Sequence, residues 1–309
     1  MRKFIKKTML LCTFTTIFLL FFFCKSNCEP YRSILAKAGN AEEYDRGSAM
    51  EILPYIDQAR AKDSEYTKLI IGDSVCHQIF NSFQKYNDVY NTLGSNQAIT
   101  MAGQYLLMKE FVENHPRTTN ITLVARSLNS GIGLEGYTYQ YLIIPFTEAG
   151  MLGEMTMETL SDLEEIYGGF WLKPAVVSFI DYSPIVKKIY LNSLSTNDCD
   201  GQQFSFDYLV LMLDICEQND IEFHLLHAPM PESAREAVEQ QFANIYEKCT
   251  DKRLLPYMEQ FYESVTYYPD EYFSDGIHFG TEYNNEEDLK TYINGLVNKD
   301  SSLTDFKVD

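Results

Sequence analysis

The stretch KLIIGDS, residues 68–74, carries the strongest structural signal in this chain. It begins with apolar and β-branched side chains and ends in a Gly-Asp pair, a pattern typical of a buried strand that stops in a tight turn. Ser74 follows that turn directly. A serine at the carboxyl end of a strand presents its hydroxyl beyond the sheet, and this position favours a role as nucleophile.

A second polar motif lies near the other end of the chain, in the segment FSDGIHF at residues 273–279. Asp275 and His278 are three residues apart, so in a turn or at the start of a helix both side chains face the same way. A nucleophile, a general base and a carboxylate that orients the base are therefore all present, which predicts a triad of Ser74, His278 and Asp275. His227, at the end of another predicted strand, is the alternative base.

Apolar segments between these motifs alternate between short strand patterns and longer helical patterns. We predict strands at 67–71, 88–93, 121–125 and 221–226, and helices at 75–86, 97–114, 204–218, 231–248 and 286–298. Such alternation indicates βαβ units and a mainly parallel sheet, in which a ligand binds beyond the carboxyl ends of the strands. Ser74, Gly94, Asn96 and the segment 127–129 all follow predicted strands, so we expect them at one edge of the sheet.

The N-terminal residues differ in composition from the rest of the chain. Four basic residues precede an apolar run at residues 8–24, and Lys25 closes it. The run matches an uncleaved membrane anchor with its basic side in the cytoplasm, and a cleaved signal peptide is the alternative. Both interpretations place the body of the protein outside the cytoplasm, either membrane-anchored or secreted.

Acidic residues dominate the body of the chain. Without the five basic residues of its first 28 positions, the chain keeps 20 basic and 44 acidic residues, a formal charge of −24. A surface of this charge repels nucleic acid, so we expect no nucleic-acid partner. The seven cysteines form no CxxC motif or Cys/His cluster, so we expect no metal and no cofactor, although exported cysteines can pair.

The two polar motifs together resemble the SGNH/GDSL hydrolase superfamily over roughly residues 66–297. This resemblance implies a flavodoxin-like α/β/α sandwich, with Ser74 as nucleophile, His278 as general base and Asp275 as its orienting partner. The family has a glycine after its second strand, where Gly94 stands. Its Gly-x-Asn-Asp block is missing here.

The oxyanion donors are therefore expected to be the backbone N–H groups of Ser74 and Gly94, together with the side-chain amide of Asn129 or, as an alternative, Asn96.

Four regions follow from these patterns. We expect an N-terminal signal-anchor or signal peptide at 1–28, a linker and helix at 29–65, the hydrolase-like domain at 66–297 with an insertion at about 132–200, and a polar tail at 298–309. The departures from the family pattern resemble its membrane-anchored branch, which acylates or deacylates exported glycans.

The predicted function is that of an exported serine esterase or O-acyltransferase that acts on acyl groups, such as acetyl, of a cell-surface or extracellular glycan. A small acyl ester remains an alternative substrate. A non-catalytic glycan-binding or assembly protein that keeps the fold is the alternative of a different class.

Overall fold

The structure is a computed structural model, and it describes residues 2–25, 49–62, 65–96, 98–126, 134, 138–181, 184–193 and 201–308. Its strands are β1 (Lys68–Gly72), β2 (Tyr90–Gly94), β3 (Asn120–Ala125), β4 (Glu222–His227), β5 (Met230–Pro231) and β6 (Tyr267–Tyr268). Its α-helices are α1 (Arg2–Lys25), α3 (Ala49–Ala59), α4 (Ser74–Phe80), α5 (Met101–Asn114), α6 (Ile144–Glu148), α7 (Met157–Tyr167), α8 (Pro174–Asp181), α9 (Pro184–Ser193), α10 (Gly201–Gln218), α11 (Arg235–Lys248), α12 (Leu255–Glu263) and α13 (Glu286–Val297).

Shorter helical turns connect these elements. They are η1 (Asn81–Tyr86), η3 (Tyr139–Ile143), η4 (Leu152–Glu154), η5 (Glu232–Ala234), η6 (Lys252–Leu254), η7 (Asp270–Tyr272), η8 (Thr281–Tyr283) and η9 (Ser301–Leu303). The turn η3 is a π-helix and the others are 3-10 helices.

The central sheet is parallel, with strand order β2-β1-β3-β4. Gly72 pairs with Gly94 on one side and with Val124 on the other, so the carboxyl ends of three strands lie level with one another. These four strands are the four that the sequence predicts, each within two residues of its expected bounds. A mixed α/β fold with a parallel central sheet is therefore confirmed, and the finer flavodoxin-like assignment stays a prediction.

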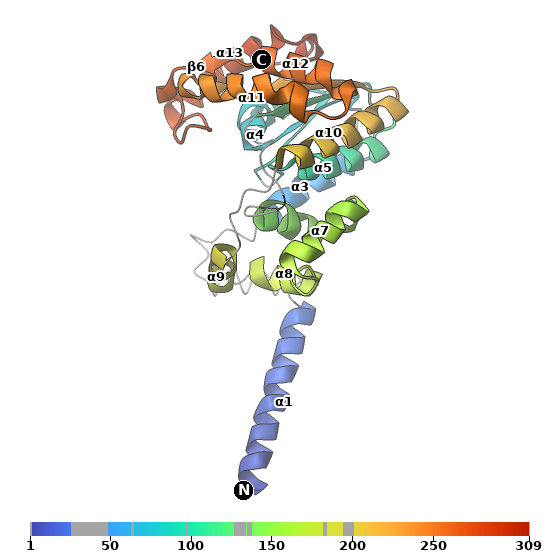
Figure 1. Cartoon of the computed structure of the whole chain (residues 1–309), viewed down its shortest axis with the longest axis vertical. Helices are drawn as coiled ribbons and strands as arrows, with labels where there is room; N and C mark the ends of the chain where they lie inside the picture. The colour runs from blue at the N-terminus through green and yellow to red at the C-terminus, as the bar shows by residue number, and fades with distance from the viewer. Residues whose placement is uncertain are drawn as a thin grey trace.

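Helices cover both faces of the sheet, because its strands are apolar on both sides. Leu69 and Ile71 of β1 pack into one core with α3, α5 and α10, whereas Ile70 between them packs into a second core with α4 and α13. Figure 1 shows the sheet between these two groups of helices. Alternate residues of one strand thus anchor opposite layers.

Two helices differ from their predicted bounds, and local capping explains where one of them begins. The Thr100 side chain accepts a hydrogen bond from the Gly103 N–H, so α5 begins at Met101 rather than at the predicted position 97, which lies outside the described residues. The predicted helix at 75–86 is an α-helix only to Phe80 and continues as 3-10 turns to Tyr86.

The helix predicted from Pro231 to Lys248 begins later than expected. Pro231 lies in β5, which pairs in parallel with β6, and α11 begins only at Arg235 after the 3-10 turn η5. The sequence pattern favoured proline at a first helical turn, but the backbone of Met230 bonds instead to Thr266, and this pairing holds the segment extended.

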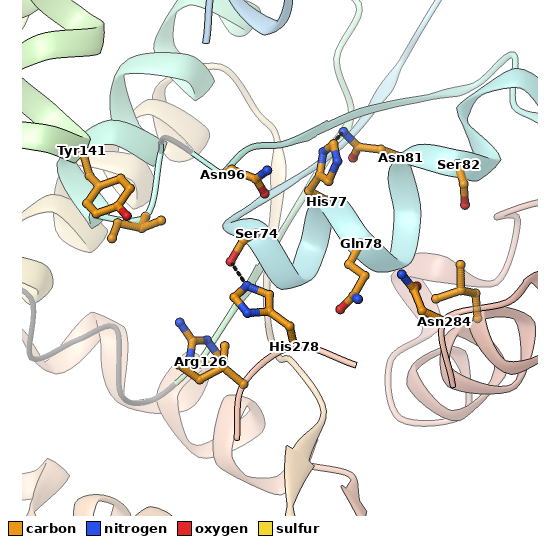
Figure 2. Close-up of a pocket in the computed structure, with 13 residues that line it drawn as sticks. Ser74, His77, Gln78, Asn81, Ser82, Asn96, Arg126, Tyr141, His278 and Asn284 are labelled. Carbon is orange, nitrogen blue, oxygen red and sulfur yellow. Dashed lines mark hydrogen bonds between the residues drawn. The ribbon is translucent and has the colours of Figure 1, made fainter. Parts of the chain in front are cut away.

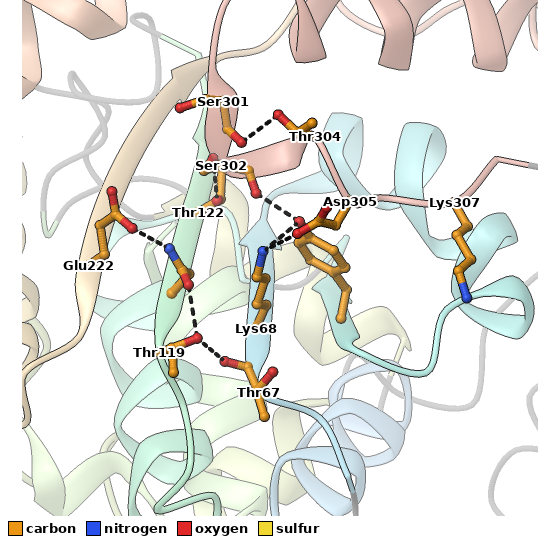
Figure 3. A network of polar contacts seen from close by, with 12 residues as sticks. Thr67, Lys68, Thr119, Thr122, Glu222, Ser301, Ser302, Thr304, Asp305 and Lys307 are labelled. Atoms are coloured by element: carbon orange, nitrogen blue, oxygen red, sulfur yellow. Dashed lines mark hydrogen bonds and ion pairs between the residues drawn. The ribbon is translucent and has the colours of Figure 1, made fainter.

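The C-terminal residues correct another prediction. The segment 298–308 is not a free polar tail, because Leu303 and Phe306 are buried in the core that α4 and α13 form. Polar contacts tie the same segment to the amino ends of the strands (Figure 3). Lys68 bonds to Asp305 at 2.9 Å, and the Tyr90 hydroxyl donates to the Ser302 carbonyl at 2.7 Å. The chain terminus therefore closes the edge of the sheet opposite to the carboxyl ends.

The described part of the predicted insertion is mostly helical, and it contains η3, α6, η4, α7, α8 and α9. Figure 1 shows α7, α8 and α9 on the side of α3 that faces away from the sheet. The N-terminal α1 extends away from this group. Among the described helices, none has the length and apolar character needed to cross a bilayer. The membrane or signal segment stays a prediction.

Candidate active site

The structure brings the two polar motifs together. The Ser74 Oγ lies 2.7 Å from the Nε2 of His278, although 204 positions separate these residues in the chain. The Nδ1 of His278 lies 2.8 Å from Asp275 Oδ2. Since a carboxylate only accepts, Nδ1 carries a proton, which leaves Nε2 as the acceptor for the serine hydroxyl. Figure 2 shows the Ser74–His278 contact at the N-terminal end of α4.

The nucleophile is positioned by the turn between β1 and α4. Asp73 caps α4, and its Oδ1 accepts from the N–H of Val75 at 2.9 Å and of Cys76 at 3.5 Å. The other carboxylate oxygen lies 3.3 Å from the Nε of Arg126, which follows β3. Both side chains of this ion pair are buried. Asp73 is thus a capping residue, and it ties the helix that begins at Ser74 to the segment after the neighbouring strand β3.

Two glycines allow α4 to lie directly against the strand ends. A Cβ on Gly72 would lie 2.2 Å from the Val124 carbonyl oxygen, and a Cβ on Gly94 would lie 2.3 Å from the backbone nitrogen of His77. Backbone atoms cannot move aside as a flexible side chain can. The pairing of glycines at the ends of β1 and β2 therefore sets how deeply the serine sits at the sheet edge.

The base is held by a tight turn in an exposed loop. Asp275 Oδ1 accepts hydrogen bonds from the backbone N–H groups of Ile277 and His278, at 3.0 and 2.8 Å. Gly276 lies between Asp275 and Ile277 with φ of 76°, a conformation that glycine adopts at no steric cost. Partial burial raises the pKa of Asp275, but the hydrogen bonds from His278 and Ile277 outweigh it and hold the pKa below its usual value. The carboxylate is therefore ionised where it contacts the imidazole.

A pocket of about 1110 Å³ opens around the hydroxyl of Ser74. Besides the serine and His278, its lining is rich in side-chain amides and hydroxyls, with a few apolar groups and one guanidinium. The lining residues are Gln78, Asn81, Asn96, Asn284, Ser82, Tyr141, Ile99, Ile277, Leu289, His77 and Arg126. These residues come from α4 and η1, from the segments that follow β2 and β3, from η3 of the predicted insertion, and from residues 277–289, which reach into α13.

The expected oxyanion donors differ in where they lie. Asn96 is exposed and lines the pocket beside Ser74 (Figure 2). Gly94 is buried against His77 and is not among the residues that line the pocket. Asn129 lies outside the described residues. Asn96 thus lines the pocket and Gly94 does not, and the choice between Asn96 and Asn129 stays a prediction.

The alternative base does not reach the pocket. His227 is fully buried, its Nδ1 donates to the Ala228 carbonyl at 2.6 Å, and its ring packs against Phe261. Burial lowers the pKa of His227 to about 4. A group that is buried and bonded in this way is a core residue, and His278 is the imidazole that contacts Ser74.

His77 lines the pocket wall, but its ring faces away from the serine (Figure 2). Its Nδ1 lies 2.8 Å from the Tyr55 hydroxyl and 3.2 Å from the Gly94 carbonyl oxygen. These contacts fix α4 against α3 and the end of β2.

Three cysteines lie in the core, and one of them is Cys76, two residues after Ser74. Burial raises the pKa of the Cys76 thiol well above its usual value, so this residue is a small apolar group rather than a second nucleophile. Within the described part of the chain, Cys76, Cys216 and Cys249 are free, and Cys199 falls outside that part. Three tyrosines stand close together in the sequence at 137, 139 and 141. Tyr141 lines the pocket, Tyr139 is buried, and residue 137 is not described.

Sequence reasoning assigned no role to two residues of the site, Gln78 and Arg126. Gln78 stands four positions after Ser74 on one helix, and this spacing was the signal that both face one side. Arg126 directly follows a predicted strand, at the edge where ligands bind.

Comparisons with known proteins place this chain in no family. No protein-family model matches the sequence, and no curated protein matches it. The solved structure of a candidate platelet activating factor from Streptococcus pneumonia aligns with 88% of this chain and 98% of its own, at 12% sequence identity and a TM-score of 0.39. A likeness at this level is too distant to assign a fold or a function.

Proposed function

We propose that this protein is a serine esterase or acyltransferase in which Ser74, His278 and Asp275 carry out acyl transfer. The observation that carries the proposal is the continuous chain of hydrogen bonds, 2.7 Å from Ser74 to His278 and 2.8 Å from His278 to Asp275, at the wall of an open pocket. Nucleophile, base and orienting carboxylate then have the mutual geometry that acyl transfer requires.

The first half-reaction forms an acyl-enzyme. His278 Nε2 takes the proton of Ser74 as its Oγ attacks the ester carbonyl carbon, and Asp275 stabilises the imidazolium that results. Negative charge develops on the carbonyl oxygen, within reach of the Asn96 amide and the backbone N–H of Ser74. Each donor of this kind lowers the barrier by about 3 kcal/mol. The imidazolium then protonates the leaving alcohol oxygen as the carbon–oxygen bond breaks.

The second half-reaction decides between the two activities. Water or a sugar hydroxyl gives its proton to His278 and attacks the acyl carbon, and the imidazolium returns a proton to Ser74 Oγ. Water makes the protein an esterase, and a sugar hydroxyl makes it a transferase. The role of His278 is the same in both activities, because its imidazole takes a proton from the acceptor oxygen and returns a proton to Ser74 Oγ.

The pocket supports an acylated glycan as the substrate. Its volume exceeds what a small acyl ester fills, and amides from two separate segments, Asn96 and Asn284, line it together with Tyr141. Amides both donate and accept hydrogen bonds, and they can therefore satisfy sugar hydroxyls. A tyrosine ring offers a flat apolar surface for a sugar ring. The expected export of the protein points to the same substrate class.

A fluorophosphonate probe tests the nucleophile. We expect labelling at Ser74 that is absent in Ser74→Ala and slower by about 10²–10⁴-fold in His278→Ala, because the general base is lost. A His227→Gln variant that remains folded is the matched control and should label at the wild-type rate. A folded wild-type protein that is never labelled would contradict the proposal and would favour the non-catalytic glycan-binding protein.

A second measurement separates hydrolysis from transfer. Purified protein given 4-nitrophenyl acetate releases acetate if water is the acceptor. If a sugar hydroxyl is the acceptor, added oligosaccharide becomes acetylated, and mass spectrometry of the oligosaccharide reports the transfer.

A further inference from the structure

The loop that carries the base is held in place at few points. Side chains of Asp275 and His278 are 53% and 35% exposed, and the residues from Ser274 to Gly276 are exposed as well. The loop closes on itself through the bridge between Phe273 and Phe279 and the hydrogen bond from Ser274 N–H to the His278 carbonyl. An exposed loop of this kind opens easily unless another element fixes it.

Gln78 fixes the loop from the nucleophile's own helix. Its side-chain amide donates from Nε2 to the Phe279 carbonyl oxygen at 2.9 Å and accepts from the Phe279 N–H, at Oε1, at 3.0 Å. One amide thus satisfies both backbone groups of a single residue, as a neighbouring β-strand would. Phe279 directly follows His278 in the chain, so this clamp lies one residue from the base.

The clamp and the nucleophile share one rigid support. Ser74 and Gln78 are four residues apart on α4, where side chains lie on the same face. Figure 2 shows both pointing from α4 toward the segment that carries His278. Phe279 is also anchored by its buried ring, which stacks on Tyr292 at 3.9 Å. That stack holds Phe279 against α13, whereas Gln78 sets its position relative to the serine.

We infer that Gln78 is a positioning residue that holds His278 at hydrogen-bonding distance from Ser74 through its two bonds to the Phe279 backbone. This inference rests on the proposed function, since it assigns Gln78 a part in the same acyl transfer. Gln78 also lines the pocket, so the competing role is direct contact with substrate. The two roles predict different kinetics. A displaced base slows the chemical step, whereas a lost contact weakens binding.

The test uses the full chain and the fluorophosphonate probe, with the rate of Ser74 labelling followed against probe concentration. Gln78→Met has nearly the same size but no polar group. We expect its limiting labelling rate to fall about 100-fold, the effect of a misplacement near 1 Å, while half-saturation stays at the wild-type concentration. Gln78→Asn keeps the amide on a side chain one carbon shorter, and its limiting labelling rate should lie between those of wild type and Gln78→Met. Gln240→Met, an exposed glutamine on α11, is the matched control and should behave as wild type.

The outcomes separate the two proposals. If wild-type protein is labelled at Ser74 but Gln78→Met labels equally fast, the positioning role is wrong and the proposed function stands. An unchanged limiting rate with a raised half-saturation concentration would assign Gln78 to substrate contact instead. If wild-type protein is not labelled, the proposed function itself fails. Thermal unfolding of each variant confirms that it is folded, and Gln78→Asn carries the test if Gln78→Met does not fold.

Discussion

At the scale of single residues, the candidate site depends on close packing as much as on its proposed catalytic groups. Ser74 is the first residue of α4, and this helix can approach the sheet only because Gly72 and Gly94 have no side chains. Asp73 adds a cap for the helix and an ion pair to Arg126. The reactive hydroxyl therefore owes its place to its neighbours at the ends of three strands.

Gly94→Ala should destabilise the protein and displace the nucleophile's helix. The new Cβ would lie 2.3 Å from the His77 nitrogen and 2.6 Å from its Cα, so α4 has to move. We expect a loss of about 1–3 kcal/mol in the free energy of unfolding, measured in urea, together with slower labelling of Ser74.

Gly153→Ala is the matched control for this change. A Cβ on Gly153 would have no atom within 4 Å, and we expect an effect within about 0.5 kcal/mol. Equal stabilities for the two alanine variants would show that the contact between β2 and α4 is looser than the structure indicates.

At the scale of elements, an ion-paired histidine connects β4 to the C-terminal segment. His224 Nδ1 lies 3.3 Å from Asp300 Oδ1, and its Nε2 lies 3.1 Å from Glu222 Oε1. Burial lowers the pKa of His224, but the two carboxylates outweigh it and raise the pKa above its usual value. Burial raises the pKa of Asp300, but the hydrogen bonds from His224 and Ser302 outweigh burial and hold the pKa below its usual value.

These shifts predict how the stability of the protein depends on pH. Because the folded pKa of His224 is raised, its contribution is complete below the unfolded value of about 6.5 and is lost as the pH rises through the folded pKa. Because the folded pKa of Asp300 is lowered, the stabilisation from its ion pair with His224 is also lost as the pH falls below about 3.9 and through that folded pKa. The free energy of unfolding of wild type minus that of His224→Gln should therefore be largest between about pH 4 and 6.5.

His115→Gln is the control, because its pH dependence should have the opposite sign. Burial lowers the pKa of His115, which stacks on Phe111. The contribution of His115 is therefore present above about pH 6.5 and is lost as the pH falls through its lowered folded pKa. Urea unfolding at several pH values measures both differences, and a difference for His224→Gln that is the same from pH 5 to 9 would contradict the ion pair.

At the scale of the whole molecule, the chain terminus completes the core on one face of the sheet. The ring of Phe306 packs edge-on against Phe80 and Tyr90, each with ring centroids 5.3 Å away. Figure 3 shows the polar contacts of the same segment at the amino ends of the strands, such as Lys68 with Asp305. The C-terminal segment thus covers the amino ends of the strands, and the pocket around Ser74 opens at their carboxyl ends.

Phe306→Ala should lower the free energy of unfolding by about 3–5 kcal/mol, because it removes a buried ring and leaves a cavity. The neighbouring Lys307→Ala removes only an exposed ion pair with Asp88 and should cost less than about 1 kcal/mol. Denaturant unfolding of the two variants gives the comparison. A terminus that merely rests on the surface would make the two losses similar.

Local signals in the sequence were enough to predict the four strands and to single out Ser74, Asp275 and His278, which the structure joins by hydrogen bonds. Strand periodicity and Gly-Asp turns act within a few residues, and a parallel sheet then brings all strand ends to one edge, so that edge could be predicted without coordinates. Positions 127–129, with Asn129, lie outside the described residues, and that part of the predicted site stays a prediction.

Only the tertiary structure decided which residues meet across the chain. Two contacts join segments whose separation in the sequence follows no pattern, and they are the clamp between Gln78 and Phe279 and the ion pair between Arg126 and Asp73. The burial of His227 and of Phe306 likewise depends on elements that lie far from them in the chain. Each contact depends on the distance and orientation of two folded elements. A periodic pattern shows which face of an element is buried, but it does not show which partner covers that face.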